Sequence, residues 1–196
     1  IHQVQLNVTH AGISFADPLS FHSYIAKGPV YVSDLFKLYK YENSLFTMSL
    51  SGSEIDSFLE YSASLWFNRM RTSTDHLLKI KSDDEGNWFL ENRYYSFSSA
   101  AGIEYIVDVS KPEGYRVRIL GLSDGTPFYT DSMYTVAVNS YRASGGGGHL
   151  TLGAGLSSEQ IHQRRIAVSD FDMRHYLQQW IEAHQTIIPQ KGTNWR

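Results

Sequence analysis

The chain has 196 residues, of which 42% are hydrophobic and 14% aromatic, so it can bury an apolar core and is not a disordered polypeptide. Its formal net charge is −3 and no more than two basic residues adjoin, so we expect no binding to a nucleic acid polymer. No apolar run approaches the roughly 18 residues of a transmembrane segment, and the absence of cysteine excludes disulfides and thiolate chemistry.

The first half of the chain predicts short elements separated by turns. We expect a strand over 1–8, an irregular segment or short helix over 21–26, and extended chain over 29–32. Ser33 is a candidate N-cap for a short helix over 34–39. Alternating residues predict a strand over 45–50, after which Ser53 is expected to cap a helix over 54–70 with one apolar face. The segment 71–92 is charged and turn-rich and has the weakest periodicity of the chain, and within it we expect a loop tip at 83–87.

The second half predicts a hairpin and further strands and helices. Alternating residues over 102–110 and 115–120 flank a turn at 111–114. A strand over 134–138 runs into a glycine-rich loop, Ser157 or Ser158 caps a helix over 159–166, and the last helix covers 170–184. No repeat or linker interrupts the chain, and its strands and helices do not alternate strictly. We therefore expect a single α+β domain over residues 1–196.

Residue patterns that would indicate a catalytic site are few. The histidines show no metal-ligand spacing, there is no Gly-x-Ser-x-Gly sequence, and the glycine loop lacks the Gly-Lys-Ser/Thr end of a phosphate-binding P-loop. Asp170, Asp172 and His175 would support a self-contained hydrolase only if they converged in a cleft, whereas acidic residues are ordinary at a helix start. We predict no catalytic residue, no metal site and no cofactor in this chain.

Two polar corners carry an aromatic residue each and are candidates for ligand binding. Tyr41 lies in Tyr-Glu-Asn-Ser and Tyr141 in Asn-Ser-Tyr-Arg, the latter followed by four consecutive glycines at 145–148. Rings at such corners either stack on a flat ligand, at about 1–3 kcal/mol per contact, or cover the edge of the core. The glycine run is either a flexible turn or a loop pressed against a ligand.

Four stretches, in order along most of the chain, resemble motifs of one protein family. Residues 28–43 are similar to G-x-I-T-x-x-D/N-L-x-x-x-x-P-F-G-N, and 45–62 to a strand followed by T-G-x-x-I-x-x-x-L-E-x-S. Residues 101–108 are similar to S-G-I/L-x-x-x-x-D, and 136–149 to V-x-x-N-x-F/Y-x-A-x-G-G-D-G-F. The chain thus resembles the C-terminal domain of the 5′-nucleotidase, UDP-sugar hydrolase and cyclic-nucleotide phosphodiesterase family.

The resemblance implies a fold of mixed β-sheets flanked by helices and a role in recognising a nucleoside or nucleotide. In that family the base stacks between two aromatic residues, which correspond by position to Tyr41 and Tyr141, with the glycine loop beside the base and ribose. The substrate-binding residues implied in this way are Tyr41, Asn43, Tyr141, Arg142, Gly145, Gly146 and Gly147.

Two departures from the family pattern concern charged residues. Gly147 stands where the family has an acidic residue, and residues 15–19 lack the arginine of the family's upstream N-G-G-x-R. Arg142 either partly replaces that arginine or is a solvated side chain, and we favour the solvated role.

The resemblance also implies how a complete enzyme would be assembled. The family's divalent metals and catalytic residues belong to an N-terminal metallophosphoesterase domain, which this chain has no room for. That domain would be cut away or lie on a separate chain, and the whole would act in nucleotide catabolism in the periplasm or at the cell surface. The chain begins at Ile1, so we interpret it as a processed or trimmed product. The alternative is a protein-interaction module that has lost nucleotide binding.

Overall fold

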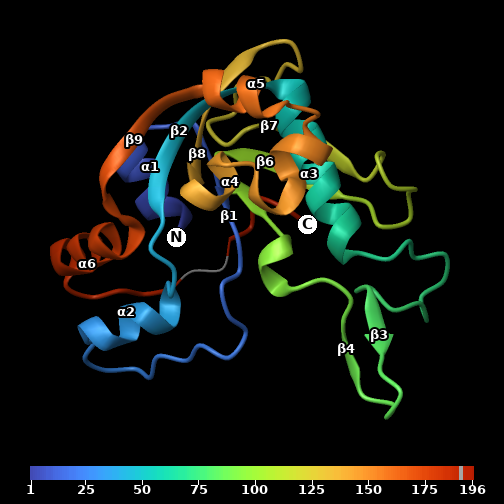
Figure 1. Cartoon of the computed structure of the whole chain (residues 1–196), viewed down its shortest axis with the longest axis horizontal. Helices are drawn as coiled ribbons and strands as arrows, with labels where there is room; N and C mark the ends of the chain where they lie inside the picture. Colours follow the sequence, from blue (N-terminus) through green and yellow to red (C-terminus); the bar gives the residue numbers. More distant parts are fainter. Residues whose placement is uncertain (190–191) are drawn as a thin grey trace.

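A mixed five-stranded sheet forms the centre of the computed structural model, which describes residues 1–189 and 192–196. The strand order is β5-β1-β8-β2-β9 (Figure 1). Strand β1 runs parallel to β8, and the other neighbouring pairs are antiparallel. The strands are β1 (Ile13–Ala16), β2 (Ser44–Ser51), β5 (Ser99–Ala101), β8 (Met133–Asn139) and β9 (Arg165–Asp172).

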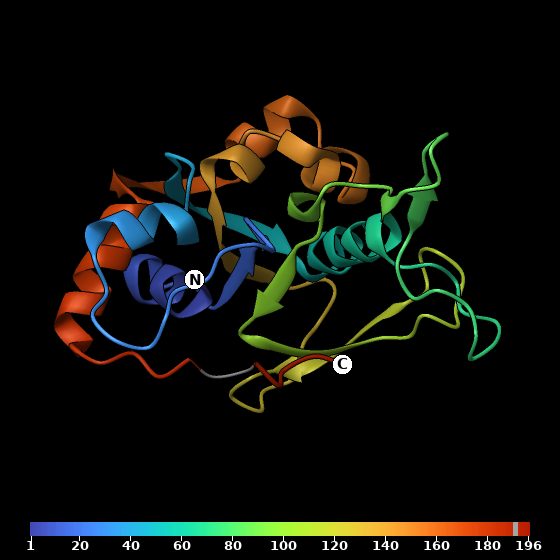
Figure 2. The same cartoon turned by 90° about the horizontal axis from the view of Figure 1, so that it is seen from below.

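Helices cover both faces of this sheet, with α1 (His2–Thr9) and α6 (Met173–His184) on one side and α3 (Gly52–Trp66) on the other (Figures 1 and 2). Alternate strand residues explain the two layers, because successive side chains of a strand point to opposite faces. On β2, Met48 joins the core beneath α3, whereas Leu45 joins the cluster formed with α1 and α6. The α+β fold class with helix-flanked sheets is confirmed.

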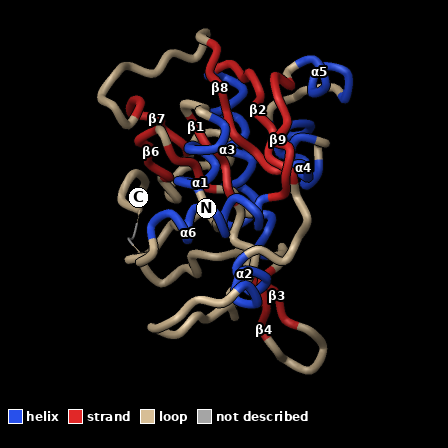
Figure 3. Tube along the Cα trace, turned by 90° about the vertical axis from the view of Figure 1, so that its left-hand side faces the viewer, coloured by secondary structure: helices blue, strands red, loops and turns tan. Residues whose placement is uncertain are grey.

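Two smaller hairpins flank the central sheet. Strands β6 (Ile103–Val107) and β7 (Val117–Leu122) form the predicted hairpin, which packs against α3. Strands β3 (Ile80–Ser82) and β4 (Trp88–Leu90) form a second hairpin that projects from the body of the molecule (Figure 3). The remaining short elements are α2 (Val32–Leu38), η1 (Tyr94–Ser96), α4 (Ser140–Ala143), η2 (Gly146–Gly148), η3 (His149–Gly153) and α5 (Ser158–Gln163).

Two sequence predictions gave the wrong type of secondary structure. The strand predicted over 1–8 is helix α1, because Val4 and Val8, one helical turn apart, pack together against the cluster that contains Leu177. Strand β9 includes residues 165–166 and 170–172, which were predicted as parts of two helices, and it forms because its backbone pairs with β2. Exposed Ile166 and Val168 lie on this edge strand.

Other predictions were wrong in their boundaries. Helix α3 is capped by Ser51 rather than Ser53: Ser51 Oγ accepts a hydrogen bond from the Glu54 amide, and Glu54 Oε2 accepts one from the Ser51 amide at 2.7 Å. The N-cap of α2 is Tyr31 rather than Ser33. Residues 21–26 form the irregular segment that was one of the two alternatives predicted there, and the loop tip predicted at 83–87 is the turn between β3 and β4. Ser157 caps α5, one of the two residues predicted.

None of the helices in residues 1–189 and 192–196 combines the length and hydropathy that crossing a bilayer requires.

Candidate functional site

A cavity of about 280 Å³ opens where four segments meet beside the central sheet. The chain after β1, the corner before β2, the η1 turn and the junction of β8 with α4 each contribute two of its lining residues. Those residues are Asp17, Leu19, Tyr41, Asn43, Arg93, Tyr95, Asn139 and Tyr141. The structure therefore brings Tyr41, Asn43 and Tyr141 together, as expected from the two polar corners.

The corner that carries Tyr141 is formed by the cap of helix α4. Strand β8 ends at Asn139, whose Oδ1 accepts a hydrogen bond from the Arg142 amide at 2.9 Å. The same side chain donates from Nδ2 to Asp17 Oδ2 at 3.3 Å. Capping turns the chain abruptly, so Tyr141 lies in the first turn of α4 with 45% of its surface exposed.

Asn43 joins the Tyr41 corner to the Tyr141 corner. Its Oδ1 accepts a hydrogen bond at 3.1 Å from the hydroxyl of Ser140, the residue before Tyr141. Its Nδ2 donates to the Tyr39 hydroxyl at 3.3 Å, and burial raises the pKa of Tyr39 to about 12, so that phenol stays neutral. Asn43 therefore fixes the two aromatic corners relative to each other while it also lines the cavity.

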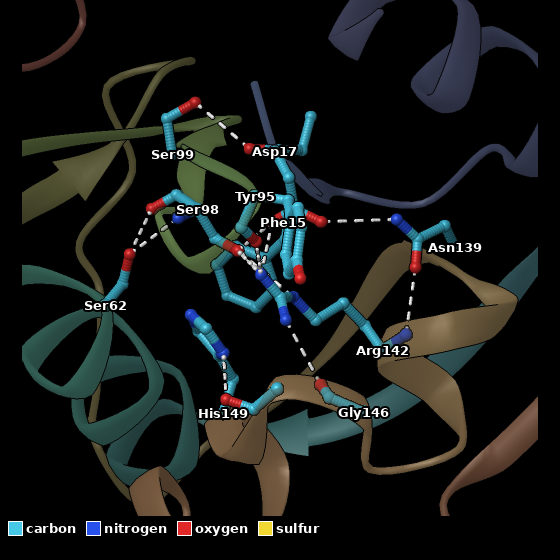
Figure 4. Close-up of polar contacts among 12 residues, drawn as sticks. Phe15, Asp17, Ser62, Tyr95, Ser98, Ser99, Asn139, Arg142, Gly146 and His149 are labelled. Carbon is cyan, nitrogen blue, oxygen red and sulfur yellow. Dashed lines mark hydrogen bonds and ion pairs between the residues drawn. The ribbon is translucent and has the colours of Figure 1, made fainter. Parts of the chain in front are cut away.

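Arg142 is buried, so the expectation of a solvated arginine is wrong. Its guanidinium lies among the polar groups of Asp17, Tyr95 and Ser98 (Figure 4). Its Nη2 lies 2.8 Å from Asp17 Oδ1, and the side chains of the two residues are 1% and 4% exposed. Nη2 also donates to the Tyr95 carbonyl at 2.6 Å, and Nη1 to the Gly146 carbonyl at 3.1 Å. Ser98 Oγ accepts from Nε and Nη2 and donates to Asp17. One guanidinium thus joins three of the segments around the cavity.

Asp17 occupies the stretch in which the family's arginine is missing, and it faces Arg142. Burial raises the pKa of the Asp17 carboxyl, whereas Arg142 and the hydrogen bonds from Ser98 and Asn139 oppose that rise. The position of Arg142 among protein acceptors makes it a positioning residue for the cavity walls rather than a group presented to a ligand.

The glycine loop packs against Arg142 and Tyr141, and Gly145, Gly146 and Gly147 are not among the residues that line the cavity. A Cβ at Gly146 would lie 2.5 Å from the Tyr141 ring. A Cβ at Gly147, where φ is +73°, would overlap the Arg142 guanidinium. The close approach that the glycines permit is therefore to the protein's own side chains.

His149 lies directly behind this loop. Its ring is buried between those of Phe58 and Tyr61, at centroid distances of 4.8 and 5.2 Å, and its Nδ1 lies 3.1 Å from the Gly147 carbonyl oxygen. Burial, reinforced by the charge of Arg142, lowers the pKa of His149 to about 3. The imidazole is therefore neutral at ordinary pH and supports the loop.

The three residues of the rival hydrolase site have roles in and around helix α6. Asp172 Oδ1 accepts a hydrogen bond from the His175 amide at 2.9 Å as the helix cap, and Oδ2 lies 3.2 Å from Arg174. The His175 ring stacks on Phe171 at 4.2 Å, and Asp170 is exposed on β9. Within the described part of the chain, no three His, Asp or Glu residues are grouped to hold a metal.

Sequence reasoning missed several lining residues, namely Asp17, Leu19, Arg93, Tyr95 and Asn139. Arg93 and Tyr95 lie in a segment for which no motif was available. Asp17 lies in the stretch that lacks the family's arginine, but the absence of that arginine does not by itself identify Asp17 as a lining residue.

The family model for the C-terminal domain of 5′-nucleotidase matches residues 1–153. The chain belongs to this family. Among curated relatives of this 5′-nucleotidase C-terminal domain, the trifunctional nucleotide phosphoesterase protein YfkN of Bacillus subtilis is 30% identical over 189 residues. The 2′,3′-cyclic-nucleotide 2′-phosphodiesterase/3′-nucleotidase of Salmonella typhimurium is 31% identical over 195 residues. The matches cover 90% and 92% of this chain but only 12% and 28% of the relatives.

Solved structures share the fold of this 5′-nucleotidase C-terminal domain. A 5′-nucleotidase precursor from Thermus thermophilus aligns with a TM-score of 0.74 at 21% identity, covering 99% of this chain and 33% of that one. A putative 5′-nucleotidase from Staphylococcus aureus aligns with a TM-score of 0.73 at 16% identity, covering 100% and 35%. At these identities the likeness shows the fold alone.

Proposed function

We propose that this 5′-nucleotidase C-terminal domain recognises the nucleoside part of a nucleotide by stacking its base between Tyr41 and Tyr141. The observation that carries the proposal is that these two residues, far apart in the sequence, line one cavity with Asn43. Its volume of about 280 Å³ is near the lower limit of ligand pockets, which are roughly 300–1,000 Å³. A cavity of this size suits a base and part of a sugar, with the rest of the ligand outside.

The surroundings of each ring support a stacking role. The Tyr141 ring packs on Gly146, and the Arg142 guanidinium carbon lies 5.5 Å from its centroid. These contacts hold the ring on one side, while 45% of the residue stays exposed for a ligand. Tyr41 is 38% exposed, and Lys40 Nζ lies 5.0 Å from its centroid. Two such rings would contribute about 1–3 kcal/mol each on stacking a base.

We further propose that hydrolysis is carried out by a metallophosphoesterase domain or chain that holds the divalent metals. The chain spans 12% and 28% of two relatives whose names describe phosphoesterases of nucleotides, which supports a recognition role within a larger enzyme of nucleotide catabolism. We also propose export to the periplasm or cell surface, as the resemblance to the family implies.

One observation favours a second candidate, a protein-interaction module. Phe21, Tyr24, Tyr31 and Phe36 are 54%, 77%, 65% and 53% exposed, in the segment between cavity residues Leu19 and Tyr41. Exposed aromatic residues this dense are typical of protein interfaces. If the chain is a nucleoside-recognition domain, the same aromatic residues would contact the catalytic domain. Only a test of nucleoside binding therefore distinguishes the recognition domain from the interaction module.

Calorimetric titration with adenosine tests the proposal. We expect binding by the parent chain and a loss of affinity of about five- to 150-fold in Tyr41→Ala. We expect no change in Tyr115→Ala, which removes a 76% exposed tyrosine from the segment between β6 and β7. Absence of binding in the parent would favour the interaction module. In a phosphate-release assay with AMP and Mn²⁺ or Zn²⁺ we expect no turnover by this chain, and metal-dependent release would overturn the assignment of catalysis to a separate domain.

A further inference from the structure

Arg93 places an uncompensated positive charge at the cavity. It lines the cavity from the residue before η1, and no carboxylate lies within ion-pair distance of it in the described part of the chain. The one carboxylate among the lining residues is Asp17, which is already paired with Arg142 beneath the cavity. Because Arg142 neutralises Asp17, the charge of Arg93 is left unbalanced at the cavity, in a chain whose formal net charge is −3.

A second cation lies beside the same opening. Lys40 Nζ donates a hydrogen bond to the Tyr94 hydroxyl at 2.8 Å, and this bond raises the pKa of Lys40. The hydrogen bond places the ammonium group between the Tyr41 corner and the η1 turn, where no described carboxylate pairs with it. Glu42, the nearest acidic residue in the sequence, pairs instead with Arg174 at 3.0 Å.

Hydrogen bonds to neighbouring elements hold the backbone around Arg93 in place. Its carbonyl accepts hydrogen bonds from the Ser96 amide at 2.8 Å and from Trp66 Nε1 at 3.4 Å. Two residues later, the Tyr95 carbonyl accepts the 2.6 Å bond from Arg142. The guanidinium of Arg93 is thus carried by a segment fixed to the same buried arginine as the Tyr141 corner.

We propose that Arg93 binds a phosphate monoester on the ribose, so that the site selects nucleoside monophosphates over nucleosides; this rests on the proposed stacking of the base between Tyr41 and Tyr141. A planar guanidinium pairs with phosphate oxygens through two parallel hydrogen bonds, and Lys40 adds a nearby positive charge. In the proposed function the base and part of the sugar occupy the cavity, so the phosphate lies at its rim, where Arg93 is exposed.

Calorimetric titration of the full chain with adenosine, 5′-AMP and 3′-AMP tests this inference. We expect at least one monophosphate to bind roughly tenfold or more tightly than adenosine, and the preferred isomer identifies which side of the ribose faces Arg93. Arg93→Gln should abolish that advantage while the affinity for adenosine stays the same. Arg118→Gln, the same change at an exposed arginine on β7, should keep it. Added salt should weaken the phosphate advantage in the parent and not in Arg93→Gln.

The outcomes separate this inference from the proposed function. If adenosine binds but neither monophosphate binds more tightly, or if Arg93→Gln keeps the advantage, the role of Arg93 is wrong and the stacking site stands. If neither adenosine nor a monophosphate binds, the proposed function itself fails, and the role of Arg93 fails with it.

Discussion

Replacing Arg142 with methionine removes the guanidinium that joins the walls of the cavity while keeping a long apolar side chain. In the parent, Arg142 and Asp17 are 1% and 4% exposed, and their charged atoms are 2.8 Å apart. The variant leaves the Asp17 carboxylate buried without its cation, and it leaves the Tyr95 and Gly146 carbonyls without a donor. The variant should therefore lose more free energy of unfolding than the removal of one hydrogen bond would cost.

The size of the loss in stability follows from the buried groups that lose their hydrogen-bond and ion-pair partner. Removing one partner of a buried ion pair costs about 3–5 kcal/mol, and we expect Arg142→Met to lower the free energy of unfolding by about that amount. The total stability of a domain is about 5–15 kcal/mol, so the variant should fold but be much less stable. Replacing Asp17 with asparagine in the same chain removes the unpaired charge and should restore about 1–2 kcal/mol.

Urea denaturation followed by tryptophan fluorescence and far-UV circular dichroism measures these changes. Arg118→Met, at an exposed arginine of β7, is the matched control and should change stability by no more than about 0.5 kcal/mol. The reasoning is refuted if Arg142→Met is within about 1 kcal/mol of this control. It is also refuted if adding Asp17→Asn makes the loss greater.

Two further predictions concern the loop behind the cavity. Gly147→Ala and Gly155→Ala both place alanine at positive φ, +73° and +71°, but only at Gly147 would the new Cβ overlap Arg142. In urea denaturation we expect Gly155→Ala to cost about 1–2 kcal/mol and Gly147→Ala clearly more, and equal costs would contradict the packing explanation. Because the pKa of His149 is lowered to about 3 from 6.5, its stability contribution is complete above pH 6.5 and is lost as the pH falls toward 3. His149→Phe should therefore flatten the decline of stability in that range by about 1.4 kcal/mol per pH unit, and an unchanged slope would count against a buried neutral imidazole.

The strands with alternating apolar residues could be predicted from the sequence, and the elements determined by distant contacts could not. Strands β2, β6, β7 and β8 lie where alternation placed them. The valines of α1 favour a strand locally, and the helix forms because Val4 and Val8 reach a cluster that includes Met173 and Leu177 from the other end of the chain. The outward residues of β9 are apolar and exposed, so no alternation marks it, and pairing with β2 determines its conformation.

Residues of the candidate site could be predicted from the sequence where their neighbours in the sequence indicate their role. Tyr41 and Tyr141 could be identified because an aromatic side chain at a polar corner is unusual, and both line the cavity. The role of Arg142 could not be read from its neighbours, since burial depends on Asp17 and Tyr95, which come from other segments. The glycine loop was predicted to be a flexible turn or a loop pressed against a ligand, whereas the groups packed against it are Tyr141 and Arg142 of the protein itself.

A crystal structure of the chain soaked with adenosine would show whether the base stacks between the two tyrosines. We expect the adenine ring between the side chains of Tyr41 and Tyr141, in the cavity lined also by Asn43. Adenosine bound elsewhere on the molecule, or bound in the cavity without contacting both rings, would contradict this expectation.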